Sequence, residues 1–325
     1  MSNFSDFIGG GGGGSPFPTM VFQESTTWAC PVAMEALVYV IGAGGSGAFR
    51  AAQSNHQVGG GGAGGCAVSK LTLAAQNYTL TIGSGGIETV GYNQNHGADG
   101  GASEMSGSGM TTMTANGGTG GRYTSSSSGS GSTGGSATGG TLYNNAGGGV
   151  PVNTPSTSFT KSGGGGVGLF GAGEDGSWIG TNQQMAMGGM VMGWSDPITA
   201  SSSTVSTVGA DVIYKKNMPV TCDIFPGLKF QFGAPVNLTG VYDTNNVSSG
   251  TYPRRLVHSG KTYILPSGPF CGGAGYGGSE TGNQFAASGI CGGGGGGMCQ
   301  QDARYGYSGG GGSGIVIICP ISIGA

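Results

Sequence analysis

Two short motifs in this sequence have the spacing of known chemical sites. Gly42-Ala-Gly-Gly-Ser-Gly47 follows an apolar run and matches G-x-G-x-x-G, in which glycines let the backbone approach a pyrophosphate. That site also needs a helix and an acidic residue about 20 positions on, and residues 60–72 contain no Asp or Glu. Gly306-Tyr-Ser-Gly-Gly310 matches the G-x-S-x-G elbow, but a glycine run follows where the elbow requires a helix. We interpret both as chance matches in a glycine-rich chain.

Histidine and cysteine give no clear constellation either. His56, His96 and His258 are too scattered in the sequence to suggest a catalytic triad or a metal cage. A zinc site would need ligand pairs at short spacing, and no C-x-x-C pair is present. We therefore expect reduced thiols that pack as small apolar groups, and we predict no catalytic residue, no metal and no cofactor. The cysteines are Cys30, Cys66, Cys222, Cys271, Cys291, Cys299 and Cys319.

The composition excludes several classes of protein. Glycine accounts for 77 of 325 residues, charged residues for only 8%, and the net charge is −3. A basic surplus for nucleic-acid binding is missing, and no apolar run is long enough to insert into a membrane. Glycine-rich chains are often disordered, but the 36% hydrophobic content is enough to build a core. The start of the chain lacks the pattern of a secretory signal, so we expect synthesis and assembly in the cytoplasm.

The elements that would position any site are strands. Met34–Ile41 is almost continuously apolar, as in a strand buried on both faces, and Tyr78–Ile82 alternates with period two. Ile315–Ile323 predicts a further strand, broken at Pro320. Residues 181–194 are the only candidate helix, and their glycines disfavour it.

The chain divides into a tether and one large domain. Residues 1–20 combine Phe4, Phe7 and Ile8 with a glycine run, and they predict a tether that docks to another protein. Residues 21–325 form the glycine-rich domain, in which 196–266 is poor in glycine and predicts an all-β insertion.

Ordering so many glycines costs backbone entropy, so a large and regular set of favourable interactions must offset that cost. An extended helix with three residues per turn has no internal hydrogen bonds. Without Cβ atoms, several such helices can approach and satisfy one another's backbone groups. We therefore predict an all-β fold with almost no α-helix, a β-sandwich into which a bundle of polyglycine II helices is inserted. The glycine-rich stretches are 59–65, 97–121, 129–149, 163–173, 271–278, 289–297 and 309–314.

The spacers between glycine runs would then lie at the ends of the bundle as loops. Their tyrosine, asparagine, serine and tryptophan residues are those that antibody loops use for binding, and loops on rigid scaffolds often carry function. The alternative is that these aromatics cap and shield the bundle. The candidate receptor-binding residues are Tyr92, Asn93, Asn95, His96, Tyr123, Tyr143, Asn144, Asn145 and Trp178.

Five stretches carry a resemblance to a known family, the glycine-rich domain common in bacteriophage tail fibres. They are Trp28-Ala-Cys-Pro31, Val38–Gly47, Leu71–Gly86, Asn116–Gly121 and Gly309–Ile318. The resemblance covers about residues 26–195 and 266–325, and the insertion 196–266 and the first 20 residues depart from it. It implies a β-sandwich that carries a polyglycine sandwich, as in the receptor-binding adhesins of T-even-type phages.

The function expected from this resemblance is adhesion. We expect a non-enzymatic virion protein, a tail-fibre or tail-tip adhesin, whose loops bind a host-surface protein or polysaccharide. Other virion proteins would bind the N-terminal segment, and a homo-oligomer is compatible with the sequence. One alternative is a structural virion protein, for capsid decoration, a head fibre or a tail connector. An antifreeze-type glycine-helix protein is disfavoured, because its flat faces need little aromatic content.

Overall fold

The fold is taken from a computed structural model of the chain, which contains no α-helix among the residues that it describes. Nor does this part of the chain contain a helix long and apolar enough to cross a bilayer. The described residues are 19–51, 57–91, 95–124, 131–152, 160–169, 171–176, 178–179, 188–189, 206–209, 239–243, 255–258, 261–264, 270, 272–273, 275–278, 284–286, 291–293, 297–299 and 306–323.

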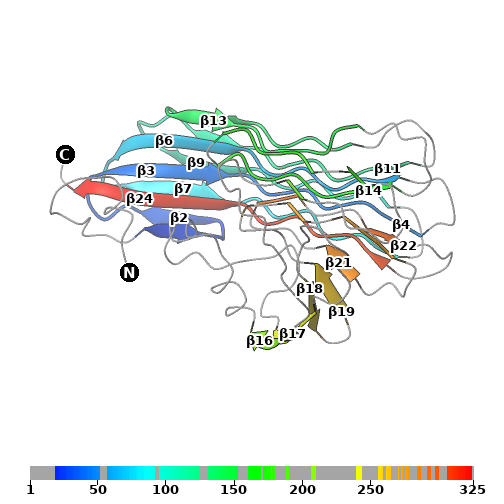
Figure 1. The fold of residues 1–325 in the computed structure, drawn as a ribbon. Helices are drawn as coiled ribbons and strands as arrows, with labels where there is room; N and C mark the ends of the chain where they lie inside the picture. Colours follow the sequence, from blue (N-terminus) through cyan, green and yellow to red (C-terminus); the bar gives the residue numbers. More distant parts are fainter. Residues whose placement is uncertain are drawn as a thin grey trace.

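Two five-stranded antiparallel sheets form one end of the molecule (Figure 1, left). The first sheet has the order β1-β24-β3-β6-β13, and the second has the order β12-β10-β9-β7-β2. The predicted all-β class is confirmed. The first sheet consists of β1 (Met20–Phe22), β24 (Ile315–Ile323), β3 (Met34–Ile41), β6 (Cys66–Leu73) and β13 (Tyr143–Asn145). The second consists of β12 (Ala137–Thr138), β10 (Met113–Ala115), β9 (Ser103–Gly107), β7 (Asn77–Thr81) and β2 (Thr26–Ala29).

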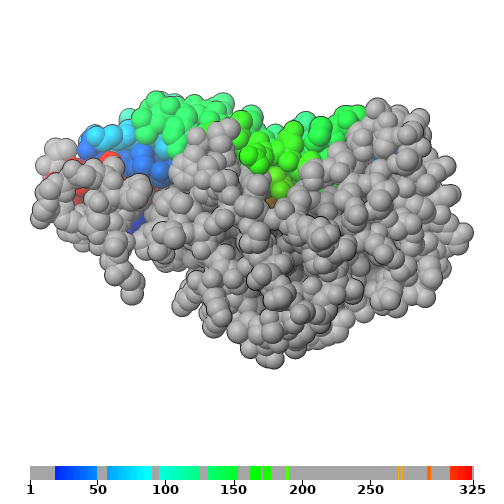
Figure 2. Space-filling view, in the orientation of Figure 1, coloured from blue at the N-terminus to red at the C-terminus, as the bar shows by residue number. Residues whose placement is uncertain are grey.

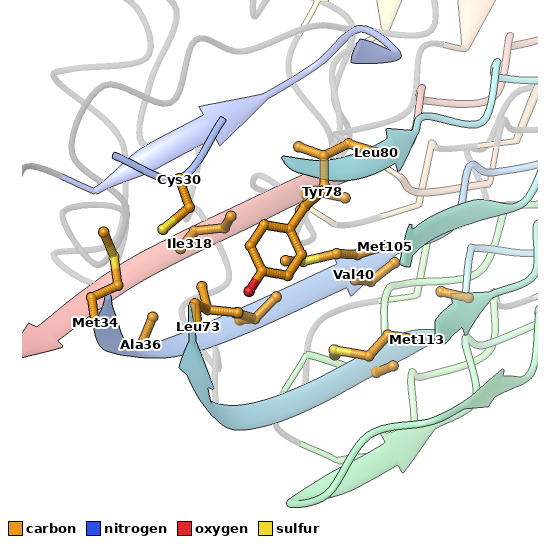
Figure 3. Close-up of a cluster of buried hydrophobic side chains, with 14 residues drawn as sticks. Cys30, Met34, Ala36, Val40, Leu73, Tyr78, Leu80, Met105, Met113 and Ile318 are labelled. Atoms are coloured by element: carbon orange, nitrogen blue, oxygen red, sulfur yellow. The ribbon is translucent and has the colours of Figure 1, made fainter. Parts of the chain in front are cut away.

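The main core lies between these two sheets (Figure 3). Met34, Val40 and Ile318 from the first sheet meet Tyr78 and Met105 from the second, and all five are buried. Along β7, burial alternates with period two, as the sequence predicted.

A second core covers the other face of the first sheet. Tyr39, Ile41 and Ile317 pack there against Leu169 and Phe270. The first sheet is therefore buried on both faces, which explains the unbroken apolar run in β3. β24 pairs with β3 from Ile315 to Ile323, so Pro320 does not end the strand but coincides with a shift of register.

Glycine-rich segments extend from the sandwich strands, and their hydrogen bonds follow a repeat of three residues. Within residues 42–48, every third N–H donates to the same neighbouring segment. Gly42, Gly45 and Ala48 donate to the carbonyls of residues 65, 62 and 59. Ala43 and Ser46 donate to residues 101 and 98, and Gly44 and Gly47 donate to residues 312 and 309. The N–H groups of one extended segment thus donate to three neighbouring segments, although none of these pairings is a β-ladder.

The same pattern propagates through a layer of such segments, here called the glycine layer. Gly59, Gly62 and Gly65 donate in turn to residues 122, 119 and 116. Gly311 and Gly314 donate to residues 86 and 83. The described segments of the glycine layer are 42–48, 59–65, 82–89, 95–101, 116–122, 131–136, 146–150, 163–169, 171–176, 188–189, 272–273, 291–293 and 308–314.

Side chains on the glycine layer point outward where the layer ends. Thr133 and Ser136 are exposed. Figure 2 shows segments from the middle of the sequence, coloured green, along the upper edge of one face of the molecule. Asn116 donates to Ser136 at 2.9 Å, and the Thr133 N–H donates to the Thr119 hydroxyl at 2.8 Å. Polar side chains therefore replace the missing neighbouring backbone at this edge.

Short sheets close the end of the glycine layer that faces away from the sandwich, here called the distal end (Figure 1, right). They are β11-β5-β14-β15, β20-β22-β4 and β23-β8. The strands are β4 (Phe49–Ala51), β5 (Gln57–Val58), β8 (Val90–Gly91), β11 (Tyr123–Thr124), β14 (Thr160–Ser162), β15 (Trp178–Ile179), β20 (Tyr276–Gly278), β22 (Gly297–Cys299) and β23 (Gly306–Tyr307).

The predicted insertion contributes four strands to a sheet of its own, β16-β17-β18-β19-β21. β16 (Ser206–Gly209), β17 (Thr239–Asp243), β18 (Arg255–His258) and β19 (Lys261–Ile264) are antiparallel, and β21 (Gln284–Ala286) is parallel to β19. Where the chain leaves and re-enters the glycine layer, the Gly272 N–H donates to the Gly189 carbonyl at 2.8 Å. The candidate helix 181–194 falls almost wholly outside the described residues.

Candidate functional site: the distal end

The distal end is where connections distant in sequence come together. Residues 51 and 57, 91 and 95, and 124 and 131 flank three of these connections. The flanking strands pair with one another: β5 with β11, β8 with β23, and Phe49 with Asn95 by an isolated bridge. The glycine layer therefore returns the chain repeatedly to one end, as its antiparallel connectivity requires.

An aromatic pair lies at this end. The rings of His96 and Tyr123 stack with centroids 4.4 Å apart and planes inclined by 21°. The Tyr123 N–H donates to Nδ1 of His96 at 3.3 Å, which leaves the proton of a neutral imidazole on Nε2. Tyr123 also packs against buried Ala48 and Val58, so the pair rests on the rigid part of the chain.

The electrostatics of this pair favour a neutral histidine. Partial burial lowers the pKa of His96, and the positive charge of Arg122 lowers it further. His96 and Arg122 are both exposed. The carboxylate of Asp99, three residues after His96, accepts the Gly120 N–H at 2.7 Å and so satisfies a backbone donor.

Trp178 lies in the same small sheet as Tyr123. It pairs with Ser162 of β14, and the order β11-β5-β14-β15 places it at the opposite edge of that sheet from Tyr123. Tyr92 and Asn93 lie outside the described residues, as do Phe4, Phe7 and Ile8. Of the predicted loop cluster, the structure thus brings Asn95, His96, Tyr123 and Trp178 to the distal end.

The prediction that Tyr143, Asn144 and Asn145 join this cluster is wrong. They form β13, the edge strand of the first sandwich sheet, and pair with β6. Tyr143 packs against the second core and shares a hydrogen bond with Tyr39, and burial raises its pKa to about 12. Asn144 accepts the Gly140 N–H at 2.7 Å, and Asn145 donates to the Gly168 carbonyl at 3.0 Å. These three side chains therefore make contacts within and next to the first sandwich sheet and do not lie at the distal end.

A comparison with known families bears on the whole chain. The sequence model of the family described as Glycine-rich domain matches residues 19–319. The chain belongs to the Glycine-rich domain family. Its match also runs across the insertion at 196–266, which we expected to depart from the family pattern. No curated protein matches the sequence.

The two motifs that suggested chemistry are built into this glycine-rich domain as backbone structure. Residues 42–47 donate their N–H groups to neighbouring segments, which accounts for their glycines. Ser308 is buried, and its hydroxyl accepts hydrogen bonds from the N–H and the hydroxyl of Thr89, each at 2.9 Å. It is thereby withdrawn from solvent, unlike a nucleophile at an elbow.

The described cysteine side chains behave as core residues of the domain. Cys30, Cys66, Cys291 and Cys319 are buried and free, as the sequence predicted. Burial is the main cause that raises the pKa of each thiol, to about 11 for Cys319. These thiols are therefore protonated and poorly nucleophilic at neutral pH.

Sequence reasoning missed one residue of the distal end, Arg122. It stands directly before Tyr123 in the spacer that we had singled out for its aromatic and serine residues. Its significance depends on the effect of its charge on His96, which is 26 positions earlier, and no local signal indicates that the two residues lie near each other. The scarcity of charged residues, 8% of the chain, was the available hint, because an exposed arginine is unusual here.

Proposed function

We propose that this chain is a non-enzymatic bacteriophage virion protein, a tail-fibre or tail-tip adhesin that binds a receptor on the host surface. The observation that carries the proposal is the convergence of Asn95, His96, Tyr123 and Trp178 at the distal end. Binding residues concentrate where a rigid scaffold holds connections together. The resemblance of five stretches of the sequence to the glycine-rich domain of phage tail fibres supports the virion setting.

The scaffold of this adhesin would be a bundle of polyglycine II helices. The three-residue repeat of donors supports this, because such a helix has three residues per turn and directs successive N–H groups about 120° apart. Each helix then bonds to several neighbours and cannot move alone. A rigid bundle lowers the entropy cost of binding, since the distal residues are held in place before the receptor arrives.

The protein would be attached to the virion through its N-terminal segment. The N-terminal segment with Phe4, Phe7 and Ile8 would dock to other virion proteins, and copies of the chain could associate there. Assembly would take place in the host cytoplasm, and the mature site is the virion, at a tail fibre or tail tip. A host-surface protein or polysaccharide is the partner at the distal end.

The test is binding of the purified, fluorescently labelled chain to a panel of bacterial strains. We expect saturable binding to some strains, and competition with virions that contain the chain. The double variant His96→Ala/Tyr123→Ala should lose about 2 kcal/mol of binding free energy or more. The matched control is Asn144→Ala/Leu142→Ala, which removes exposed side chains at the sandwich end.

Two outcomes would contradict the adhesin. If no strain binds the chain and labelled antibodies place it on the capsid or at a tail joint, the structural alternative replaces the proposal. If both double variants bind equally well, the receptor contact is not at the distal end.

A further inference from the structure

Arg122 is a cation without a counter-ion in the part of the chain that the structure describes. Lys70 pairs with Glu35 at 2.8 Å on the first sandwich sheet, whereas no described acid lies within ion-pair distance of Arg122. The nearby Asp99 directs one carboxylate oxygen to the Gly120 N–H. In a chain with net charge −3, an exposed and unpaired guanidinium at the candidate binding end stands out.

The stacked rings of His96 and Tyr123 lie near this arginine, whose charge acts on His96. Tyr123 covers one face of the imidazole, and the His96 side chain is nonetheless exposed. Because Nδ1 accepts the Tyr123 N–H, the Nε2–H remains as a donor. The site therefore offers an aromatic face, a neutral N–H donor and a guanidinium that can bind an oxyanion through two hydrogen bonds.

We propose that the distal end binds an acidic sugar, with the sugar ring on the face of His96 and its carboxylate or phosphate on Arg122. The inference rests on the proposed function and names the chemical class of the receptor. A ring of carbon and hydroxyl groups matches a small platform bordered by donors. The anionic substituent supplies the charge complementarity that Arg122 lacks among the described residues.

The proposal has a consequence for His96 itself. Part of the depression of its pKa comes from the charge of Arg122. An anion bound to Arg122 would offset that charge, so the pKa of His96 should rise when the acidic sugar binds. A neutral sugar on the same ring would leave the Arg122 contribution in place.

The experiment measures binding by calorimetry and follows the His96 imidazole by NMR titration. The probes are a galacturonic acid oligosaccharide, a neutral maltohexaose, inorganic phosphate and a short glutamate peptide. We expect the acidic oligosaccharide to bind, to weaken as salt rises, and to raise the pKa of His96. Arg122→Gln should weaken binding about tenfold. Lys70→Gln removes the same charge at the sandwich end and should have no effect.

Other outcomes would overturn the inference. Equal binding of maltohexaose would remove the role of charge, and equal binding of inorganic phosphate would reduce the site to an anion contact. Preference for the glutamate peptide would point to a protein receptor. Arg122→Gln that keeps full affinity would also refute it.

Adsorption to host cells separates this inference from the proposed function. If cells bind the chain but acidic sugars do not, the adhesin stands and the ligand class is wrong. If acidic sugars bind and raise the His96 pKa while no cell binds the chain, the site is a sugar site and the adhesin is wrong.

Discussion

Gly44 illustrates why many positions of the glycine layer admit no side chain. A Cβ on this residue would meet the carbonyl oxygen of Gly292, which belongs to a neighbouring segment. The backbone cannot yield without breaking the Gly44 N–H donation to Gly312. Each glycine of this kind is required by the approach of another chain segment.

Gly44→Ala is therefore expected to destabilise the domain by several kcal/mol, because overpacking and unpaired backbone groups each cost about 1–3 kcal/mol. Gly101→Ala is the matched control, since its added Cβ would lie 3.0 Å from the Ser84 nitrogen and 3.1 Å from Gly83 Cα, a milder contact. Denaturant unfolding of both variants measures the difference. Equal losses would argue against close backbone packing as the reason for the glycines.

His96 predicts a pH dependence of stability. Its pKa is lowered in the folded state, so the unfolded chain binds the proton more readily. The contribution of His96 to the free energy of unfolding should fall as pH drops through its unfolded pKa of about 6.5. This contribution should be absent below its folded pKa. His96→Asn keeps an acceptor near Nδ1 but does not titrate. Unfolding free energies at pH 7.5 and pH 5 should differ more for the parent chain than for this variant, and an equal difference would exclude His96 as the cause.

At the scale of elements, hydrophobic period predicted the long strands and failed for the short ones. Met34–Ile41 and Ile315–Ile323 could be read because each has at least eight residues of apolar pattern. β5 and β11 have two residues each, and a period cannot appear in so short a stretch.

β13 is a short strand whose composition is that of a loop. Two asparagines follow Tyr143, and Gly140 lies three positions before it; both residue types are typical of turns. The burial of Tyr143 depends on Tyr39 from a strand far earlier in the sequence. Composition therefore indicated a loop where tertiary contacts make a strand. The convergence at the distal end, in contrast, followed from alternating runs and spacers and could be anticipated.

β24 offers a matched pair for testing the assigned topology. Ile317 is fully buried between β1 and β3, whereas Ile323 at the end of the same strand is 37% exposed. Ile317→Ala should cost about 2–5 kcal/mol of unfolding free energy, and Ile323→Ala much less, because only the former leaves a cavity. Similar losses for the two variants would count against a central position for this strand.

At the scale of the whole molecule, the glycine layer couples segments that are far apart in sequence. Residues 42–48 bond to segments that begin at 59, 95 and 308. Such a layer gains its hydrogen bonds only when many segments are in place, so we expect it to form cooperatively. The sheet β16-β17-β18-β19-β21 has no part in that network among the described residues.

The insertion should therefore be removable. The hydrogen bond between Gly272 and Gly189 holds its two ends together, and Phe270 anchors the return in the second core. Replacing 196–266 with a short glycine-serine linker keeps all three residues, so the thermal midpoint of the remainder should be unchanged. Binding to host cells should survive as well, because the distal end is intact. The contrasting variant is Gly135→Val, whose added side chain would meet the Asn116 carbonyl of a neighbouring segment of the glycine layer. This second variant should unfold or precipitate. A stable linker variant that no longer binds cells would move the receptor contact from the distal end to the insertion, and an unstable one would make the insertion part of the cooperative unit.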